Sequence, residues 1–268
     1  MNAEVHSHTE TPLITVAMPV FNGGVYLKAA VASIVAQTYP HWQLMLVDDG
    51  STDGAIDALP MLSDPRIHVV RDGRNLGLAA RLNQIIDQAE GDFIARMDGD
   101  DISHPERFAR QVQALQQHPT VDLVAARCRT ISSNGQLLGV LPFVGTHQEI
   151  CATPWKGFYM PHPTWMGRVA WFRRYRYANP APYCCEDQEL LLRSYVSSTF
   201  MALPEELLDY RLRDSLAWRK AWRTRTALGQ LQVRHFAQQG QYGHMLRAML
   251  VRLGRHAKDV WQWMKAAP

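Results

Sequence analysis

The stretch that decides the fold is residues 14–53, which read ITVAMPVFNGGVYLKAAVASIVAQTYPHWQLMLVDDGSTD. An apolar run at 13–18 and another at 43–47 predict two buried strands, and apolar residues recur between them at helical spacing. Polar residues follow each strand: Asn22 after the first, and Asp48-Asp49-Gly50-Ser51 after the second. Strand, helix and strand in this order predict two parallel strands joined by a crossover helix.

The same alternation continues outward from this stretch to about residue 126. Further strands are expected at 66–70, 92–97 and 121–126, and helices at 51–59, 76–89 and 103–118. Strands and helices alternating at this spacing predict an α/β fold with a mostly parallel sheet covered by helices on both faces.

Local signals refine the expected boundaries. Ser103-His104-Pro105-Glu106 predicts a helix start, with Ser103 as the cap and proline in the first turn. Asn134-Gly135 between two short apolar runs, 129–132 and 137–141, predicts a hairpin. Farther along, a helix is expected at 186–194 and a late strand at 199–203.

The composition predicts a folded chain with a proper core, because 47% of its 268 residues are hydrophobic and 20% are charged. The first ten residues are polar and do not resemble a secretory signal, and no run of eighteen apolar residues predicts a membrane-spanning helix. A cytoplasmic location is therefore expected. The four cysteines lack zinc-site spacing and are expected to be free thiols: Cys128, Cys151, Cys184 and Cys185.

Charge divides the chain near residue 210. Residues 210–268 hold twelve Lys and Arg residues against two aspartates, a balance of +10, so the total of +3 leaves −7 for residues 1–209. We expect a catalytic domain over 1–209 and a basic amphipathic extension of two helices over 210–268. Apolar residues of the last helix fall largely on one face: Tyr242, Met245, Leu246, Met249, Leu250, Leu253, Val260, Trp261 and Met264.

Two interpretations of this extension remain open. Its basic residues and its four tryptophans (Trp218, Trp222, Trp261 and Trp263) suit contact with an anionic membrane surface. The alternative is a helical pair packed on the catalytic domain, or a dimer contact.

Three carboxylates follow the strand expected at 92–97: Asp98, Asp100 and Asp101. In open α/β sheets ligands bind beyond the carboxyl ends of the strands, which is where these residues and the Asp49 loop would meet. Carboxylates crowded within four residues repel one another unless a cation compensates them, and such hard oxygen ligands suit Mn²⁺ or Mg²⁺. The structural alternative is a solvated turn in which Asp101 caps a helix.

Other nucleotide and hydrolase motifs are absent from the sequence. It contains no G-x-x-x-x-G-K-[ST] phosphate loop, no G-x-G-x-x-G fingerprint at 73–77, and neither G-x-S-x-G nor H-E-x-x-H.

Several segments together resemble glycosyltransferase family 2, which has the GT-A fold. Residues 14–53 are similar to the start of that family, and 75–112, which include Asp98-Gly99-Asp100, are similar to its middle with the D-x-D motif. PHPTWMGR at 161–168 and CCEDQELLLR at 184–193 resemble its acceptor-side segments. The resemblance covers about residues 13–212. It implies a nucleotide-sugar half over about 13–101 and an acceptor half over about 102–209.

The resemblance also implies roles for single residues. Pro19 and Phe21, with Asn22 beside them, would line the pocket for the nucleotide base, and Asp49 would hydrogen-bond the base, usually uracil. Arg81 lies on the helix that would face the diphosphate. Asp98 and Asp100 would form the D-x-D pair, with Asp100 as the direct ligand of Mn²⁺ or Mg²⁺ and Asp98 near both nucleotide and metal.

Asp187 matches the catalytic base of the family, and Glu186 is its nearest rival. An acceptor hydroxyl needs a group that removes its proton as the new bond forms, and a carboxylate in a partly closed apolar pocket can do this. The alternative role of Glu186 is to complement the dipole of the following helix. Because the family inverts configuration by direct displacement, one base suffices.

His162 and Trp165 lie in the segment 161–168 and are candidates for contact with donor or acceptor. His162 suits contact with phosphate, metal or acceptor, and a buried structural histidine is the alternative. Trp165 belongs to a dense group of aromatic residues that suits sugar rings but equally suits a core.

The resemblance implies a hexosyltransferase that moves one sugar from a nucleotide-diphosphate donor, a UDP-sugar, to a saccharide or lipid-linked saccharide during bacterial surface polysaccharide synthesis. Processive members carry Q-x-x-R-W, whereas this chain has LLDYRLRDS at 207–215. One alternative is a catalytically silent binding subunit with the same fold. A further alternative is a nucleotidyltransferase, which would need a Gly-rich, Lys-bearing loop after the first strand. This chain has PVFNGG at 19–24, with no adjacent basic residue except Lys28. A nucleic acid partner is not expected, and attachment would be peripheral, at the inner face of the plasma membrane.

Overall fold

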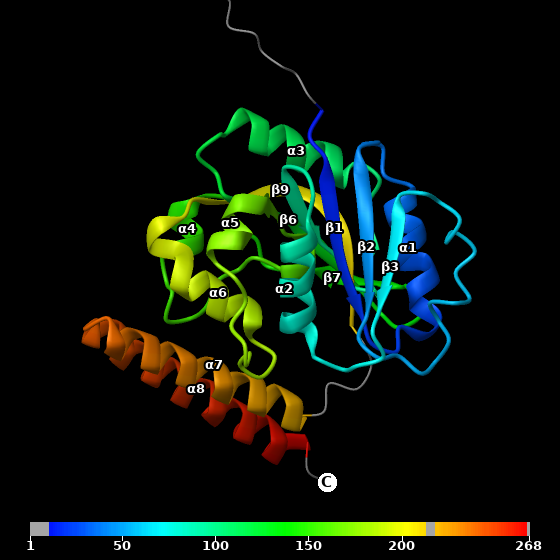
Figure 1. Cartoon of the computed structure of the whole chain (residues 1–268). Helices are drawn as coiled ribbons and strands as arrows, with labels where there is room; N and C mark the ends of the chain where they lie inside the picture. The colour runs from blue at the N-terminus through cyan, green and yellow to red at the C-terminus, as the bar shows by residue number, and fades with distance from the viewer. Residues whose placement is uncertain (1–10, 213–217, 267–268) are drawn as a thin grey trace, which may run out of the picture.

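A nine-stranded sheet forms the centre of the protein, and the computed structural model describes residues 11–212 and 218–266 (Figure 1). Four neighbouring strands form its parallel part, in the order β3 (Ile67–Arg71), β2 (Trp42–Asp48), β1 (Ile14–Val20) and β4 (Phe93–Arg96). Their carboxyl ends therefore meet at one edge of the sheet, as the sequence predicts.

The second part of the sheet mixes strand directions. It contains β8 (Met166–Arg168), β6 (Leu123–Ile131), β9 (Phe200–Arg211), β5 (Ile102–Ser103) and β7 (Leu137–Val140). The short strand β8 runs antiparallel to both β4 and β6 and so joins the two parts. β9 runs parallel to β6, while β7 pairs with β6 as the predicted hairpin.

Helices cover both faces of the sheet. The chain forms α1 (Leu27–Val35), α2 (Leu78–Gln88), α3 (Arg107–Gln117), α4 (His147–Cys151), α5 (Val169–Arg174) and α6 (Glu186–Ser194), with 3₁₀ turns at η1 (Gly24–Tyr26), η2 (His162–Thr164) and η3 (Tyr195–Ser197). Alternate residues of β1 point to opposite faces. Met18 joins the core under α1 and α3, whereas Ala17 joins the core under α2, α5 and α6.

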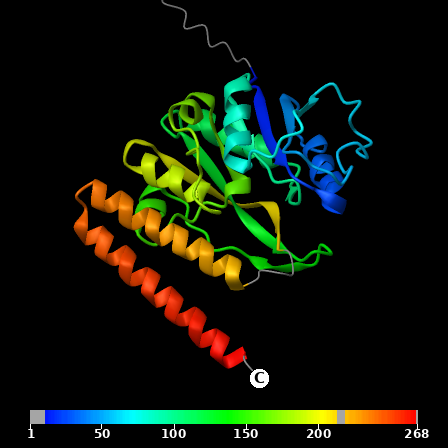
Figure 2. The same ribbon diagram turned by 60° about the horizontal axis from the view of Figure 1, so that its bottom comes forward.

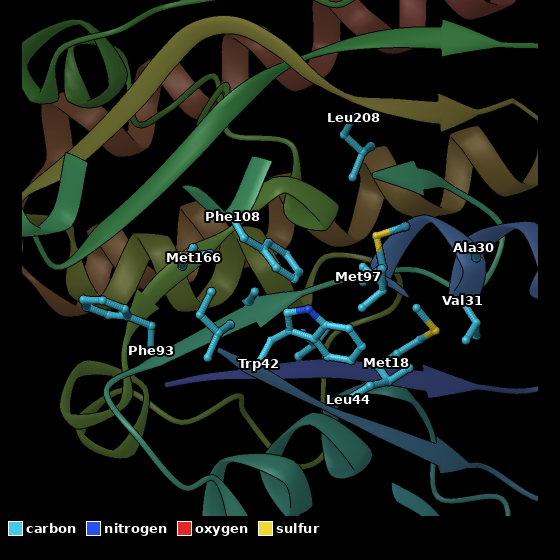
Figure 3. Close-up of a cluster of buried hydrophobic side chains, with 14 of the residues drawn as sticks. Met18, Ala30, Val31, Trp42, Leu44, Phe93, Met97, Phe108, Met166 and Leu208 are labelled. Atoms are coloured by element: carbon cyan, nitrogen blue, oxygen red, sulfur yellow. The ribbon is translucent and has the colours of Figure 1, made fainter. Parts of the chain in front are cut away.

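The core on the α1 and α3 side is built from long apolar side chains. Figure 3 shows Trp42 of β2 beside Met18 and Leu44, with Phe108 of α3 above them. All four are at most 2% exposed. Their burial fixes the strand order, since removing such side chains from water is the main favourable term in folding.

The helix expected at 51–59 is wrong, because these residues form turns. Gly54 has a positive φ of 69°, which ends helical geometry. The carboxylate of Asp53 accepts hydrogen bonds from the backbone N–H groups of Gly24, at 2.8 Å, and Ala55, at 3.2 Å. A carboxylate that bonds local backbone in this way competes with helix formation.

The cap expected at Ser103 is also wrong. Ser103 lies in β5, where it pairs with Leu208 of β9, and α3 begins four residues later at Arg107. Its hydroxyl accepts from the side chain of Gln37, at 3.1 Å, and not from the first turn of α3. Tertiary pairing with β9 therefore overrides the local signal.

Two antiparallel helices, α7 (Trp218–Gln238) and α8 (Tyr242–Ala266), form the expected C-terminal extension (Figures 1 and 2). α7 lies against α6, and α8 lies on the outer side of α7. The expected domain boundary at 209/210 falls inside β9, which ends at Arg211. Among the described residues, no helix is long and apolar enough to cross a membrane. The first ten residues, for which no signal was expected, lie outside the described ranges.

All four cysteines are free thiols, as expected. Cys128 and Cys185 are buried, and Cys184 is exposed.

Gly91 lies between α2 and β4, and its replacement tests how closely the backbone of Leu13 approaches it. It has a φ of +89°, and an added Cβ would lie 2.6 Å from the carbonyl oxygen of Leu13. Gly135 has a φ of +84° with nothing within 4 Å of its added Cβ. We expect Gly135→Ala to lower the free energy of unfolding by about 1 kcal/mol, from backbone strain alone, and Gly91→Ala by about 3 kcal/mol.

Urea denaturation followed by circular dichroism measures both variants. Equal losses at the two positions would contradict the close approach of Leu13 to Gly91.

Candidate active site

A cavity of about 960 Å³ lies beyond the carboxyl end of β4. The loops and helix ends around it supply its lining, chiefly residues 76–80, 141–142, 158–163, 179–188 (without Tyr183 and Cys185), Arg96, Asp98, Tyr210 and Lys220. Of the residues predicted from the sequence, four line this cavity together: Asp98, His162, Glu186 and Asp187. The sequence therefore predicted groups that lie far apart in the chain and meet at one site.

The three aspartates after β4 form a compact acidic cluster. Asp98, Asp100 and Asp101 each place a carboxylate oxygen within 4.8 Å of the others. Asp101 is buried rather than solvated, and its Oδ1 accepts the backbone N–H of Arg211 at 2.8 Å. Its Oδ2 is buried without a hydrogen-bond donor among the described residues. Burial raises the pKa of Asp101 well above its ordinary value, and the charge of Asp98 raises it further.

This cluster fits a hard divalent cation. Carboxylate oxygens are the ligands that Mg²⁺ and Mn²⁺ prefer, and a cation beside Asp101 would compensate a buried oxygen that otherwise lacks a partner. Asp98 also forms an ion pair with Arg96, which compensates part of the negative charge from the protein side.

Asp49 is buried and holds the loop that follows β3. Its carboxylate accepts backbone N–H groups of Leu76, at 2.7 Å, and Gly77, at 3.0 Å, and the Nε–H of Arg81 at 2.8 Å. These bonds attach the end of β2 to the start of α2, whose first residues line the cavity. Contact between Asp49 and a nucleotide base stays a prediction.

Arg81 is 1% exposed, and all five of its N–H donors meet protein acceptors. Besides Asp49, it pairs with both oxygens of Asp72, at 2.6 and 3.0 Å. It also donates to the carbonyl of Arg74 and to the side chain of Gln84. Its observed role is to hold Asp49 and Asp72, and binding of a diphosphate by Arg81 stays a prediction.

The loop after β1 carries the residues expected at the base. Pro19 lies in β1 opposite Val47, and Phe21 is 55% exposed just beyond that strand. Asn22 has a φ of +51°, and its side-chain oxygen accepts the backbone N–H of Thr52 at 2.9 Å. The loops after β1 and β2 are thus joined, although none of these three residues is among those that line the cavity.

Glu186 and Asp187 begin α6 and line the same cavity as Asp98. Burial raises the pKa of Asp187, and burial together with the charge of Asp187 raises the pKa of Glu186. The side chain of Gln188 donates to Asp187 Oδ2 at 3.2 Å and exchanges two hydrogen bonds with the backbone of Phe158. A carboxylate with a raised pKa in a cavity is suited to accept a proton.

His162 lines the cavity close to Glu186. Its Nε2 shares a hydrogen bond of 2.7 Å with the hydroxyl of Tyr177, and its Nδ1 is 3.9 Å from Glu186 Oε1. Burial, aided by the positive charge of Arg96, lowers the pKa of His162 well below its usual value. The ring is therefore neutral and packs edge-on against Trp165.

Trp165 belongs to the core. It is 0% exposed, and its indole N–H donates to the carbonyl of Met160 at 3.1 Å. The structure thus favours the core interpretation for Trp165, which contacts the cavity lining through His162, Met160 and the backbone N–H of Arg96.

Arg96 is a site residue that the sequence analysis did not single out. It is 4% exposed and lines the cavity, yet its Nε and Nη1 have no hydrogen-bond acceptor among the described residues. A charged residue inside the apolar strand DFIARM was the available signal, since an arginine is rarely fully buried without a role. Because Arg96 lines the cavity beside Asp98, its positive charge suits an anionic group bound there.

Tyr177, Tyr210 and Lys220 were also missed. Tyr210 comes from β9 and Lys220 from α7, and both line the cavity. Tyr177 forms a hydrogen bond with His162. No sequence motif marks them, because only the tertiary fold brings β9 and α7 to this place.

Arg81 allows a test of the buried ion pairs. Arg81→Lys keeps the charge but cannot reach all five acceptors, so we expect the free energy of unfolding to fall by about 2 kcal/mol. Arg74 pairs with the same Asp72 from the surface, where its side chain is 69% exposed. Arg74→Lys is the matched control and is expected to cost less than about 0.5 kcal/mol in the same urea titration. Equal effects would show that burial of the Arg81 network contributes nothing.

The chain is similar to known proteins in sequence and in fold. EpsE of Bacillus subtilis, whose assignment as a glycosyltransferase is provisional, is 39% identical over 110 residues, which are 40% of this chain and 40% of EpsE. The match therefore spans less than half of that relative. The structure of S. aureus TarS with UDP-GlcNAc superposes with a TM-score of 0.65 at 16% identity, over 82% of this chain and 66% of that one.

A mannosyltransferase from Pyrobaculum calidifontis, solved with GDP-Man and Mn²⁺, superposes with a TM-score of 0.66 at 18% identity over 97% of this chain and 77% of that one. These likenesses show a GT-A type fold. The family model described as glycosyl transferase family 2 matches residues 15–176, which is more than half of the chain. The protein therefore belongs to glycosyl transferase family 2.

Proposed function

We propose that the protein is an inverting, metal-dependent hexosyltransferase that moves one sugar from a nucleotide-diphosphate donor to a hydroxyl of a saccharide acceptor. The observation that carries this proposal is that Asp98 of the D-x-D motif and Asp187 of α6 line the same cavity. A diphosphate held near Asp98 and a hydroxyl held near Asp187 would meet there.

The donor is proposed to be a UDP-sugar. The complex of TarS with UDP-GlcNAc supports this choice. The Pyrobaculum protein is in complex with GDP-Man, so a GDP-sugar is the alternative donor. Pro19, Phe21, Asn22 and Asp49 would surround the base at the ends of β1 and β2. The positive charge of Arg96, which lines the cavity and pairs with Asp98, would attract the anionic part of the donor.

Asp98 and Asp100 would hold Mn²⁺ or Mg²⁺, with Asp100 as the direct ligand. When bound, such an ion supplies positive charge that stabilises the departing nucleoside diphosphate. The acidic cluster and the Mn²⁺ in the Pyrobaculum structure support this proposal.

Asp187 is proposed as the base. The acceptor oxygen attacks the sugar carbon as the bond to the diphosphate breaks, and the hydroxyl proton passes to a carboxylate oxygen of Asp187. Gln188 donates to that carboxylate and holds it in place. The raised pKa of Asp187 supports this role because a more basic carboxylate accepts a proton more readily. Glu186, closer to His162, would shape the acceptor side.

The acceptor is proposed to be a saccharide or lipid-linked saccharide of surface polysaccharide synthesis, reached from the cytoplasm at the inner face of the plasma membrane. Residues 207–212, where processive relatives would approach their Q-x-x-R-W motif, lie mostly in β9, and 213–215 are outside the described ranges. The absence of that motif from the sequence supports transfer of one sugar per encounter.

The alternative is a catalytically silent subunit that keeps the fold for binding. The assembled cavity with both carboxylate groups favours the enzyme.

Replacement of the base gives a direct test. Asp187→Asn is expected to lower donor hydrolysis by roughly a hundred- to ten-thousand-fold while nucleotide binding is retained. Glu186→Gln is the matched neighbour and is expected to have a smaller effect. The wild-type rate rises with pH as Asp187 loses its proton, and because its pKa is raised, this rise lies above the usual range of an aspartate.

The measurement is release of nucleoside diphosphate against pH. Full activity in Asp187→Asn, or a larger loss in Glu186→Gln, would remove Asp187 from this role.

The donor class and the metal are tested together by calorimetric titration of UDP, GDP, dTDP and CDP, each with Mn²⁺ and with EDTA. We expect one nucleotide to bind in a metal-dependent manner and Asp100→Asn to lose that binding. Asp57, whose side chain is 71% exposed on the surface, provides the control variant Asp57→Asn. If the wild type bound none of the four with either addition, the silent-subunit alternative would replace the enzyme.

A further inference from the structure

α8 exposes most of its large apolar side chains. Residues spaced by three or four positions share one face of a helix, and here that face is exposed. We call this face the outer stripe, and its described large members are Tyr242 (66% exposed), Leu246 (55%), Met249 (42%), Leu250 (59%), Leu253 (64%) and Trp261 (55%). Figure 2 shows α8 outside α7, with no described element over its outer side. The side chains of Val260, Met264 and Lys265 lie outside the described set.

The opposite face of α8 holds the helix to the protein through the apolar side chains of Ala248, which is 1% exposed, and Met245, and also through polar groups. Arg255 donates to the carbonyl of Lys156 at 2.9 Å, and Asp259 forms an ion pair with Arg225 of α7. The ring of His256 stacks on that of Trp222 with centroids 4.0 Å apart. A surface helix normally buries its large apolar side chains, whereas α8 exposes most of its own.

Basic side chains border the outer stripe. Arg247 and Lys258 are exposed, and the guanidinium of Arg247 lies 4.7 Å over the ring of Trp155. Residues 210–268 carry a balance of +10, which already counts their two aspartates. The stripe is thus apolar along its centre and positive beside it.

We propose that the outer stripe of α8 lies on an anionic lipid bilayer, with the helix parallel to the surface. An apolar stripe bordered by Lys and Arg, with a tryptophan on it, has the chemistry of an interfacial helix. Leucine and methionine enter the acyl boundary, and the basic side chains meet the headgroups. A second copy of this chain would bring two strongly positive extensions together, which opposes self-association through the same face.

The position of α8 relative to the cavity gives this contact a purpose, which rests on the proposed transferase function. Lys220 of α7 lines the cavity, and Trp222, two residues later, stacks on α8. The loop before α6 joins them, because Arg223 lies 4.2 Å over the ring of Tyr183. A lipid-linked acceptor held in the bilayer would therefore present its saccharide beside the cavity.

The test is co-sedimentation of the full chain with vesicles of phosphatidylcholine alone or mixed with phosphatidylglycerol. We expect binding to the anionic vesicles that falls as salt is raised. The double variant Leu250→Gln with Leu253→Gln is expected to bind roughly tenfold more weakly, because two leucines no longer enter the acyl boundary. Leu137 and Leu138 of the hairpin are 61% and 56% exposed, so Leu137→Gln with Leu138→Gln is the matched control and should bind as the wild type does.

Light scattering and nucleotide titration accompany the vesicle assay. Unchanged unfolding and unchanged nucleotide binding in the α8 variant would show that only the lipid contact is lost. Binding to neither vesicle, equal binding to both, or equal losses in the two double variants would overturn the proposal. A wild-type dimer that the α8 variant breaks, without vesicle binding, would assign the stripe to a second copy. Absence of nucleotide binding in the wild type would instead contradict the transferase proposal.

Discussion

The structure depends on how carboxylates gathered at one edge of the sheet are compensated. Parallel strands end at the same edge, so the loops after β2 and β4 bring Asp49 and Asp98 to one region. Two arginines, each at most 4% exposed, pair with them: Arg81 with Asp49, and Arg96 with Asp98. Because an unpaired buried charge of either sign is costly, each arginine fixes the loop that carries its partner. The acidic cluster of Asp98, Asp100 and Asp101 has the ligand chemistry for a cation.

The sequence predicts this edge well where local pattern and tertiary structure agree. Strands β1 to β4 and the hairpin of β6 and β7 lie where apolar runs and turn residues place them. Prediction fails where distant partners decide. Ser103 pairs with β9 instead of capping α3. Asp53 lies in the stretch 51–59 that was expected to be helical, but its carboxylate accepts the backbone N–H of Gly24, which is distant in the sequence. Arg96 was missed because only the fold brings it into one cavity with residues such as His162, which lies far along the chain.

The C-terminal helix shows a different limit of sequence analysis. Apolar periodicity in α8 correctly indicates that one face is apolar, but it does not say which face meets the protein. The usual assumption would bury that face, and the structure exposes it. The decision rests with specific polar contacts, such as Arg255 with the carbonyl of Lys156 and Asp259 with Arg225. Together with the burial of Ala248, such contacts attach the helix while the large side chains of the outer stripe stay exposed.

The extension is also part of the cavity wall rather than a separate module. Gln188, beside the proposed base, holds the backbone of Phe158 through two hydrogen bonds. The same short segment accepts a hydrogen bond from Gln232 of α7 at the carbonyl of Pro154, at 2.9 Å, and one from α8 at Lys156. The segment 154–158 is therefore fixed between α6 and the two terminal helices. The wall of the cavity in which Asp187 lies and the terminal helices are thus one connected structure.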